Sequence, residues 1–249
     1  MNQAKSYYAK PNELKDKVIL ITGAGDGIGA VVAKTYAKYG ATIILLGRTT
    51  VKLEKVYDEI EAQGSPQAAI YPFDFEGAKL EHYEQLAESI NTEFGQLHGL
   101  LHNAAILGSN TPIQQFNPAL WNKVIHINLN AAFMLTQACL PLLRKASTAS
   151  IIFTTASVGI KGSAYFGAYA VSKAANINLM EVLSDELSEN TNVRVNAINP
   201  GAVRTAMRAR SFPGEDPESL IIAEDIMSAY LYLMADQDQI ITGQVVDAQ

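Results

Sequence analysis

The sequence predicts an α/β protein with a doubly wound parallel sheet of about seven strands and helices on both faces. Short apolar segments alternate along the chain with longer segments of helical periodicity. Strands that are apolar throughout are typical of parallel sheets buried on both faces. No linker or change of composition divides the chain, so we expect residues 1–249 to form a single domain, with an N-terminal extension at residues 1–16.

Glycines mark the ends of the first helices. Gly40 and Gly64 each follow a segment of helical periodicity, and glycine readily takes the left-handed conformation that ends a helix. In this half of the chain we expect strands over residues 18–22, 41–46, 68–73 and 97–102, and helices that end near residue 39 and span 49–63 and 78–94.

The second half begins with a strong helix start. Asn117 can cap a helix and Pro118 fits its first turn. Residues 129–143 of this helix are apolar almost all the way round, which predicts burial on both sides, often between subunits. The remaining expected elements are strands over 150–155, 193–198 and 240–246, and helices over 168–189 and 223–234.

Composition excludes several classes of partner. The chain is 48% hydrophobic and 18% charged, so it can bury a sizeable core, and its net charge is -6 without a run of Lys or Arg. We therefore expect neither nucleic acid nor an anionic membrane as a partner. Cys139 is the one cysteine and is expected to be a small buried apolar group. The histidines show no metal-ligand spacing, and we expect no metal; they are residues 82, 98, 102 and 126.

The chain shows no targeting or membrane signal. Its first 17 residues are polar and lack the apolar stretch of a signal peptide. No apolar run reaches the roughly 18 residues that a membrane span requires. A soluble, cytoplasmic protein is the expectation.

A glycine cluster, Thr22–Gly29, joins the first strand to the first helix. Glycines at such a turn allow the backbone to approach a pyrophosphate, and the helix N-terminus offers N–H groups and a positive dipole end. The spacing is G-x-x-x-G-x-G, and a plain strand-to-helix turn also favours glycine. Its place directly after the first apolar strand favours a nucleotide site.

The end of the second strand carries Gly47 and Arg48 where a carboxylate would favour NAD. A guanidinium can instead form a bidentate pair with a ribose 2′-phosphate. We interpret Arg48 as a preference for NADP(H) over NAD(H); the alternative is an arginine that only faces solvent.

Tyr169 and Lys173 lie four residues apart in an expected helix, and therefore on one face. A free phenol has a pKa of about 10 and is a poor base at neutral pH. A neighbouring ammonium group favours the phenolate, so the pair could exchange a proton with an alcohol or a carbonyl oxygen.

Together these segments resemble the short-chain dehydrogenase/reductase family over nearly the whole chain. Within the family the sequence is most similar to a bacterial subgroup of YciK-like oxidoreductases, through residues 26–29, 45–48, 133–138 and 199–209. The family-like segments are Thr22–Gly29, Asp74, Asn103 to Ala105, Asn128, Tyr169 with Lys173, Asn199 to Gly201, and Thr205.

The resemblance implies a Rossmann-like fold, a homotetramer or dimer, and hydride transfer between NADP(H) and a small-molecule carbonyl or alcohol. It implies that Tyr169 is the acid/base, that Lys173 assists it, and that Asn128 holds a water linking Lys173 to solvent. Asp74 would contact the adenine. The full set of implied cofactor-binding residues is Gly23, Asp26, Gly27, Ile28, Gly29, Arg48, Asp74, Asn103, Ala104, Tyr169, Lys173, Pro200, Gly201, Val203 and Thr205.

Two positions depart from the family pattern. His102 and Ala105 flank Asn103 and Ala104 where the family has Asn and Gly. Ala156 stands at the position of the serine that polarises the substrate carbonyl, and Ser157 is one residue later. Either Ser157 serves, or Thr155 or water replaces it, or catalysis is impaired. An NADP(H)-binding sensor on the same fold is therefore the alternative function.

Residues 203–220 match the mobile substrate lid of the family. The segment carries Arg208 and Arg210, which suggest an anionic or polar substrate, although solvent-exposed charge explains them equally well. We expect the two long helices, at about 118–145 and 168–189, to assemble the oligomer.

Overall fold

The structure, a computed structural model, describes residues 3–236 and 241–249. Within them, seven strands form one parallel sheet in the order β3-β2-β1-β4-β5-β6-β7, which confirms the predicted fold class. The strand order reverses between β1 and β4, and a crevice forms at the carboxyl ends of strands at such a point. The strands are β1 (Val18–Thr22), β2 (Thr42–Gly47), β3 (Ala69–Pro72), β4 (Gly99–His102), β5 (Ala149–Thr154), β6 (Val193–Asn199) and β7 (Val245–Asp247).

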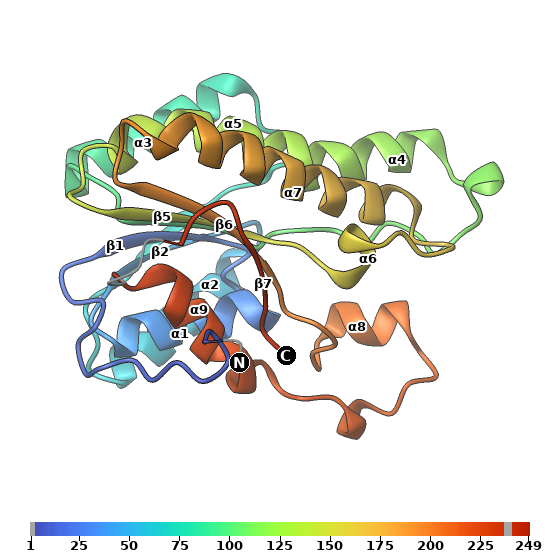
Figure 1. Cartoon of the computed structure of the whole chain (residues 1–249), viewed down its shortest axis with the longest axis horizontal. Coiled ribbons are helices and arrows are strands. Elements are labelled where there is room, and N and C mark those ends of the chain that lie inside the picture. The colour runs from blue at the N-terminus through green and yellow to red at the C-terminus, as the bar shows by residue number, and fades with distance from the viewer. Residues whose placement is uncertain (1–2, 237–240) are drawn as a thin grey trace.

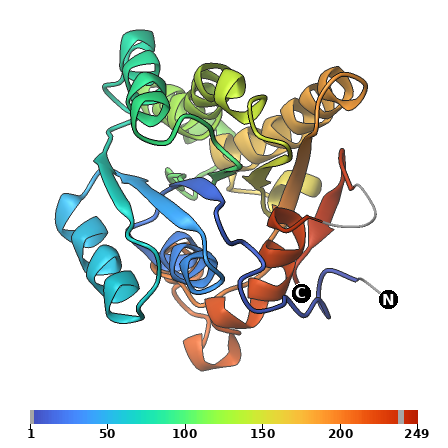
Figure 2. The same ribbon diagram turned by 90° about the vertical axis from the view of Figure 1, so that its left-hand side faces the viewer.

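Helices cover both faces of the sheet (Figures 1 and 2). One layer contains α3, α4, α5 and α7, and the other contains α1, α2 and α9. Successive residues of β1 point into opposite cores: Ile19 and Ile21 belong to one buried cluster and Leu20 to the other. The helices of these layers are α1 (Gly27–Lys38), α2 (Thr50–Ala62), α3 (Leu80–Phe94), α4 (Pro118–Ile125), α5 (Ala131–Leu143), α7 (Gly167–Ser188) and α9 (Met227–Met234).

Helices α4 and α5 are joined by a π-helical turn, His126–Asn130. The predicted start is confirmed, since the Asn117 side chain accepts a hydrogen bond from the Leu120 N–H over 3.1 Å. The single chain buries part of the surface of residues 129–143, and burial of the rest between subunits stays a prediction. Cys139 is fully buried, as predicted, but Phe133 is 48% exposed.

The last strand is shorter than predicted. The expected strand over 240–246 begins only at residue 245, and residue 240 lies outside the described residues. Ahead of β7 a side-chain bond interrupts the backbone ladder: Thr242 Oγ1 accepts from the Val195 N–H over 3.0 Å, while the Gly243 N–H donates to the Val195 carbonyl oxygen over 2.7 Å. Gly243 has a φ of +69° and turns the chain.

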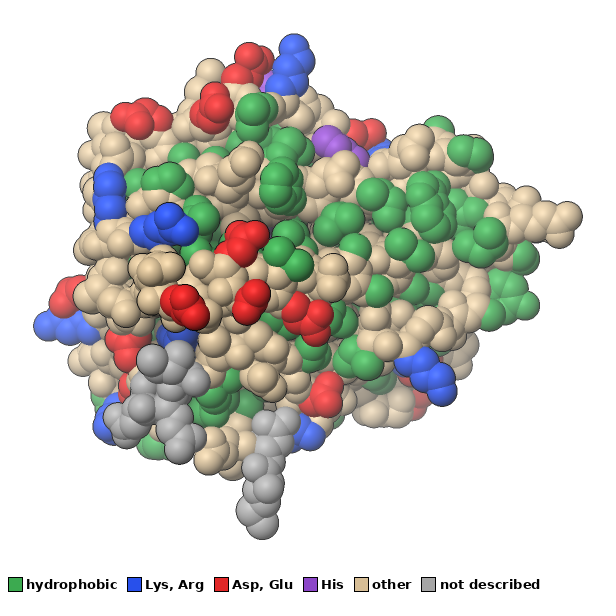
Figure 3. Space-filling view, turned by 45° about the horizontal axis from the view of Figure 1, so that its top comes forward, with side chains coloured by type: hydrophobic (Ala, Val, Ile, Leu, Met, Phe, Trp, Pro, Cys, Tyr) green, Lys and Arg blue, Asp and Glu red, His purple; other side chains and the backbone are tan. Residues whose placement is uncertain are grey.

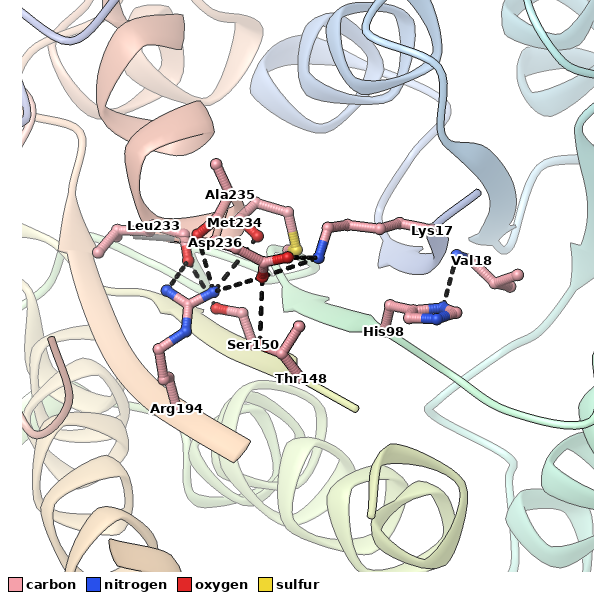
Figure 4. A network of polar contacts seen from close by, with 10 residues as sticks. All are labelled: Lys17, Val18, His98, Thr148, Ser150, Arg194, Leu233, Met234, Ala235 and Asp236. Carbon is pink, nitrogen blue, oxygen red and sulfur yellow. Dashed lines mark hydrogen bonds and ion pairs between the residues drawn. The ribbon is translucent and has the colours of Figure 1, made fainter. Parts of the chain in front are cut away.

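A polar network lies at the amino ends of the strands, opposite the crevice (Figure 4). Arg194 donates to the carbonyl oxygens of Leu233 and Ala235 at the end of α9, over 3.1 and 2.9 Å. Lys17 and Asp236 form an ion pair of 2.9 Å beside it. The network thereby joins the last helix to β6 and to the residue preceding β1.

Two further features complete the fold. Leu14 is fully buried in the core shared with α1 and α9, so the segment before β1 packs against the sheet. No helix among residues 3–236 and 241–249 has both the length and the apolar character needed to cross a bilayer.

Candidate active site

A cleft of about 740 Å³ opens at the carboxyl ends of the strands. The turn after β1, the ends of the central strands and the start of α7 form its walls. Short helices α6 (Ser157–Ile160) and α8 (Ala206–Ser211) border it. The cleft brings together most of the predicted site residues, namely Gly23, Asp26, Gly27, Ile28, Arg48, Asp74, Asn103, Ala104, Ser157, Tyr169, Lys173, Pro200, Gly201, Val203 and Thr205.

Gly29 does not line the cleft, and its role is to let the turn close. A Cβ on Gly29 would lie 2.3 Å from the Gly23 carbonyl oxygen and 2.5 Å from Asn103 Nδ2. Gly23 itself has a φ of +67°, which favours glycine. Thr22 fastens the turn to β4, because its hydroxyl accepts from the N–H groups of Asn103 and Ala104 over 2.9 and 3.0 Å.

Charged side chains gather beside this turn. Asp26 caps α1 and accepts from the Gly27 N–H over 2.7 Å. Its carboxylate also pairs with Lys52, from the first turn of α2. The Lys52 hydrogen bond is the main cause that lowers the pKa of Asp26, and the charge of Arg210 contributes. Arg48 lines the same wall, just before the N-cap of α2.

Tyr169 and Lys173 reach the cleft from the first two turns of α7. Lys173 is 2% exposed, and its Nζ donates to the Thr154 carbonyl oxygen over 2.7 Å. Burial lowers the pKa of Lys173 to about 8 and raises the pKa of Tyr169 to about 12. The ammonium lies 5.7 Å from the centroid of the Tyr169 ring. At neutral pH the tyrosine is therefore a phenol beside a cation.

Asn128 lies behind the cleft wall rather than in it. Its side chain accepts from the Ile106 N–H over 2.8 Å and donates to the Ile106 carbonyl oxygen over 3.0 Å. It also donates to the Ser172 hydroxyl, over 3.1 Å. The Asn128 carbonyl oxygen accepts from Asn176 over 2.9 Å. Asn128 thus fixes the loop after β4 to the π-helical turn.

Residues 155–157, which follow β5, differ in how far their side chains are exposed to the cleft. Ala156 precedes α6 and lines the cleft. The buried Thr155 hydroxyl donates to the Lys173 carbonyl oxygen over 3.1 Å. Ser157 is exposed in the cleft. A Cβ on Gly159 would lie 2.7 Å from Lys173 Cβ, so glycine there lets α6 pack closely on α7.

His102 faces the core on the α5 side. It stacks on Phe153 with ring centroids 4.6 Å apart and shares a hydrogen bond of 2.8 Å with the Thr136 hydroxyl. Burial is the main cause that lowers its pKa to about 3. The imidazole is therefore neutral at physiological pH. Ala105, the second departure, lines the cleft.

The segment over 203–220 covers one end of the cleft with apolar side chains. Phe212 lies with its ring centroid 5.8 Å from that of Phe166 at the start of α7. Arg208 stacks on Phe212 at 3.8 Å and forms two bonds of 2.6 Å to Glu215. The charge of Arg208 is thus compensated within the segment itself.

Sequence reasoning missed Lys52 among the cleft residues, although its place four residues after Arg48 was a signal. Asn199 was singled out by the family resemblance, but its contact with Ser157 could not be predicted, because the two residues are 42 positions apart. Among residues 3–236 and 241–249, no cluster of His, Cys, Asp and Glu could hold a metal ion.

Comparisons with known proteins agree with this geometry. The model of the short chain dehydrogenase family matches residues 17–216. The uncharacterized oxidoreductase YciK of Escherichia coli (strain K12) is 48% identical over 243 residues, 98% of this chain and 96% of that protein. A Pseudomonas syringae structure described as a short chain dehydrogenase is 50% identical, with a TM-score of 0.96 and 98% of each chain covered. A Shigella flexneri short chain dehydrogenase complexed with NADP is 48% identical, with a TM-score of 0.94, 96% of this chain and 100% of that chain being covered.

Proposed function

The chain belongs to the short-chain dehydrogenase family, and on that premise we propose that it is an NADP(H)-dependent oxidoreductase that interconverts a carbonyl and an alcohol. The observation that carries the proposal is the meeting of two features in one cleft. The glycine turn after β1 opens into the same space as Tyr169 and Lys173. A phosphate cradle beside a proton donor is the arrangement that dinucleotide-dependent reduction requires.

The residues present fit a dinucleotide. The turn that Gly23 and Gly29 form has no room for a Cβ on Gly29, and its N–H groups at the start of α1 suit a phosphate. Arg48 and Lys52 offer two cations beside it, while Pro200 and Gly201 would border the nicotinamide. Asp74 lines the cleft beyond the end of β3 and would reach the adenine.

When bound, NADPH supplies the hydride. Tyr169 is protonated at neutral pH and gives its proton to the substrate oxygen as the carbonyl is reduced. The Lys173 ammonium stabilises the phenolate that remains, because an opposite charge nearby favours the ionised form. Ser157 donates a hydrogen bond to the same substrate oxygen. In alcohol oxidation the direction of each proton transfer reverses.

We assign the preference for NADP(H) to Arg48 and Lys52 together. Both line the cleft at the end of β2 and the start of α2, where a 2′-phosphate would lie. The end of β2 carries no carboxylate, and the Asp26 carboxylate beside it is paired with Lys52. The NADP complex of the Shigella flexneri relative supports this assignment.

We propose that residues 203–220 act as the substrate lid and that the substrate is an uncharged, apolar carbonyl compound. Phe212 of this segment packs against Phe166 at the start of α7. Glu215 neutralises Arg208, so this arginine is not free to attract an anion. Arg210 acts on Asp26 at the phosphate end of the cleft.

We propose further that the protein is a homo-oligomer assembled through α5 and α7. Hydrophobic side chains gather on the face that carries these helices (Figure 3). Phe133, Val171 and Val182 are each 48% exposed on it, and exposed apolar patches of this kind are typical of protein interfaces. Sedimentation at micromolar concentration tests the proposal: a dimer or tetramer is expected, and a monomer would contradict it.

The experiment for the main proposal combines binding with turnover. NADPH and NADH are titrated by fluorescence, and a panel of cyclohexanone, benzaldehydes and quinones is then tested with the preferred cofactor. We expect tighter binding of NADPH, reduction of at least one carbonyl, and loss of turnover in Tyr169→Phe even when this variant is saturated with cofactor. Turnover retained by Tyr169→Phe would disprove the mechanism. The relatives reported above are named oxidoreductases and dehydrogenases, which favours an enzyme over an NADP(H)-binding sensor.

A further inference from the structure

The substrate end of the cleft lacks a hydroxyl group at residue 156, where the chain has alanine. The Thr155 hydroxyl is buried and donates to the Lys173 carbonyl oxygen. Ser157, by contrast, is exposed in the cleft that also contains Tyr169. Of the two neighbouring hydroxyl residues, Ser157 is therefore the one with access to a substrate.

Ser157 has a partner on the neighbouring strand. The Asn199 amide, at the end of β6, lies with Nδ2 3.3 Å and Oδ1 3.4 Å from the Ser157 hydroxyl oxygen. Asn199 is 8% exposed, so its amide is held mainly by protein atoms. The orientation of this amide decides whether the Ser157 hydroxyl donates its proton to the asparagine oxygen or keeps it for another acceptor.

Two other contacts fix the direction of the amide. The Gly201 N–H can only donate, and it lies 3.2 Å from Asn199 Oδ1. The Asp247 carboxylate only accepts when ionised, and it lies 2.9 Å from Asn199 Nδ2. Both contacts require the orientation that places Nδ2 beside Asp247 and Oδ1 beside Gly201. A flipped amide would lose both bonds. It would place Nδ2 against the Gly201 N–H, two donors, and Oδ1 against the Asp247 carboxylate, two acceptors.

In this orientation the second Nδ2 hydrogen points to Ser157, whose oxygen accepts it. The competing bond, from the Ser157 hydroxyl to Oδ1, is longer, and Oδ1 already accepts from Gly201. A hydroxyl group that accepts one bond keeps its own proton for another acceptor. The open side of Ser157 is the cleft.

We propose that Asn199 is a positioning residue that holds Ser157 so that its hydroxyl proton is donated to the substrate carbonyl oxygen. Asp247, on β7, anchors the amide. The inference rests on the proposed function, because it assigns the carbonyl-polarising group of that reaction. Ser157 only donates a hydrogen bond; no covalent bond forms or breaks at Ser157 or Asn199, and the transferred proton still comes from Tyr169.

The experiment is a set of variants assayed with a carbonyl that the wild-type protein reduces. Ser157→Ala is expected to lower kcat about 10²- to 10³-fold, as loss of one oxyanion donor does. Asn199→Ala and the isosteric Asn199→Asp are expected to lower kcat about tenfold or more, since neither can donate to Ser157. Adding Asn199→Ala to Ser157→Ala should not lower kcat further, because the effects of substituting residues that act as a unit are not additive.

A rescue variant separates positioning from a structural role. Ala156→Ser puts a second hydroxyl group in the cleft, and in that background the Ser157 and Asn199 variants should lose most of their effect on kcat. Asn196→Ala is the matched control: Asn196 lies on the same strand, is fully buried and donates to the Ile241 carbonyl oxygen over 2.8 Å. It should lower the thermal midpoint while leaving kcat unchanged. The dissociation constant for NADPH should be the same in all variants that fold.

Several outcomes would overturn the inference. They are an unchanged kcat in Ser157→Ala, multiplicative losses in the double variant, and losses that persist in the Ala156→Ser background. Failure of the proposed function looks different, since Tyr169→Phe would then retain turnover or the wild-type protein would reduce no carbonyl. If the wild-type protein reduces no carbonyl, the proposed role of Asn199 is disproved along with the reaction.

Discussion

Lys173 Nζ donates a hydrogen bond to the carbonyl oxygen of Thr154 over 2.7 Å, and the lysine side chain has no salt bridge among the described residues. Its pKa is lowered from 10.5 to about 8 by burial. A cation held away from water in this way costs stability at neutral pH.

The first prediction concerns this cost. Between pH 8 and 10.5 the unfolded chain keeps a proton on Lys173 that the folded protein has lost, so stability rises with pH through this window. Relative to Lys173→Met, the wild-type protein should gain roughly 2 kcal/mol of unfolding free energy between pH 7 and pH 10. Urea unfolding of both proteins across this range measures the difference. A difference that stays constant with pH would show that the lysine titrates normally.

The second prediction concerns the glycine turn. Gly29→Ala places a Cβ 2.3 Å from the Gly23 carbonyl oxygen, so the turn or α1 must move. We expect NADPH affinity to fall by about 100-fold or more, since small displacements at a binding turn are costly. Gly77→Ala is the matched control, because a Cβ there meets nothing within 4 Å. Equal NADPH affinities of the two variants would show that Gly29 does not shape the cofactor site.

The third prediction tests cofactor preference. Arg48→Ala and Lys52→Ala should each weaken NADPH binding about 10- to 100-fold, because a charge-assisted hydrogen bond contributes roughly 1.5–3 kcal/mol. Binding of NADH should hardly change. Lys55→Ala is the control, since Lys55 lies on the same helix outside the cleft and faces Glu59 at 4.0 Å. If NADH binding weakens as much as NADPH binding, the two cations do not recognise the 2′-phosphate.

The fourth prediction separates stability from function. Arg194→Met removes the guanidinium that donates to the carbonyl oxygens of Leu233 and Ala235 at the end of α9, while Asp236 keeps its ion pair with Lys17. We expect a loss of about 2 kcal/mol of unfolding free energy from the acceptors left unsatisfied, with NADPH affinity unchanged, because the network lies at the opposite ends of the strands (Figure 4). Arg144→Met, at an exposed site, should change neither quantity. A weaker cofactor affinity in Arg194→Met would show that the two ends of the sheet are coupled.

Local features were predictable because their cause is local. The apolar strands, the cap at Asn117 and the i, i+4 pair Tyr169 and Lys173 depend on backbone periodicity over a few residues. The start of the last strand was not predictable in the same way. Its apolar residues suit a strand, but the hydrogen bonds of residues 241–244 also involve the side chains of Thr242 and, on β6, of Asn196.

The sequence by itself determined the parallel sheet and the glycine turn after its first strand, since hydrophobic periodicity and glycine conformation specify them. Tertiary structure alone decided which polar groups meet across the sheet. Asp247 reaches Asn199 from 48 residues away, and Lys17 meets Asp236 from 219 residues away. Such contacts follow from strand order and register, which bring distant segments side by side and which no local pattern encodes. The alanine at position 156 was visible in the chain, but only the packing of β5, β6 and β7 showed which hydroxyl group stands beside it and what holds that group in place.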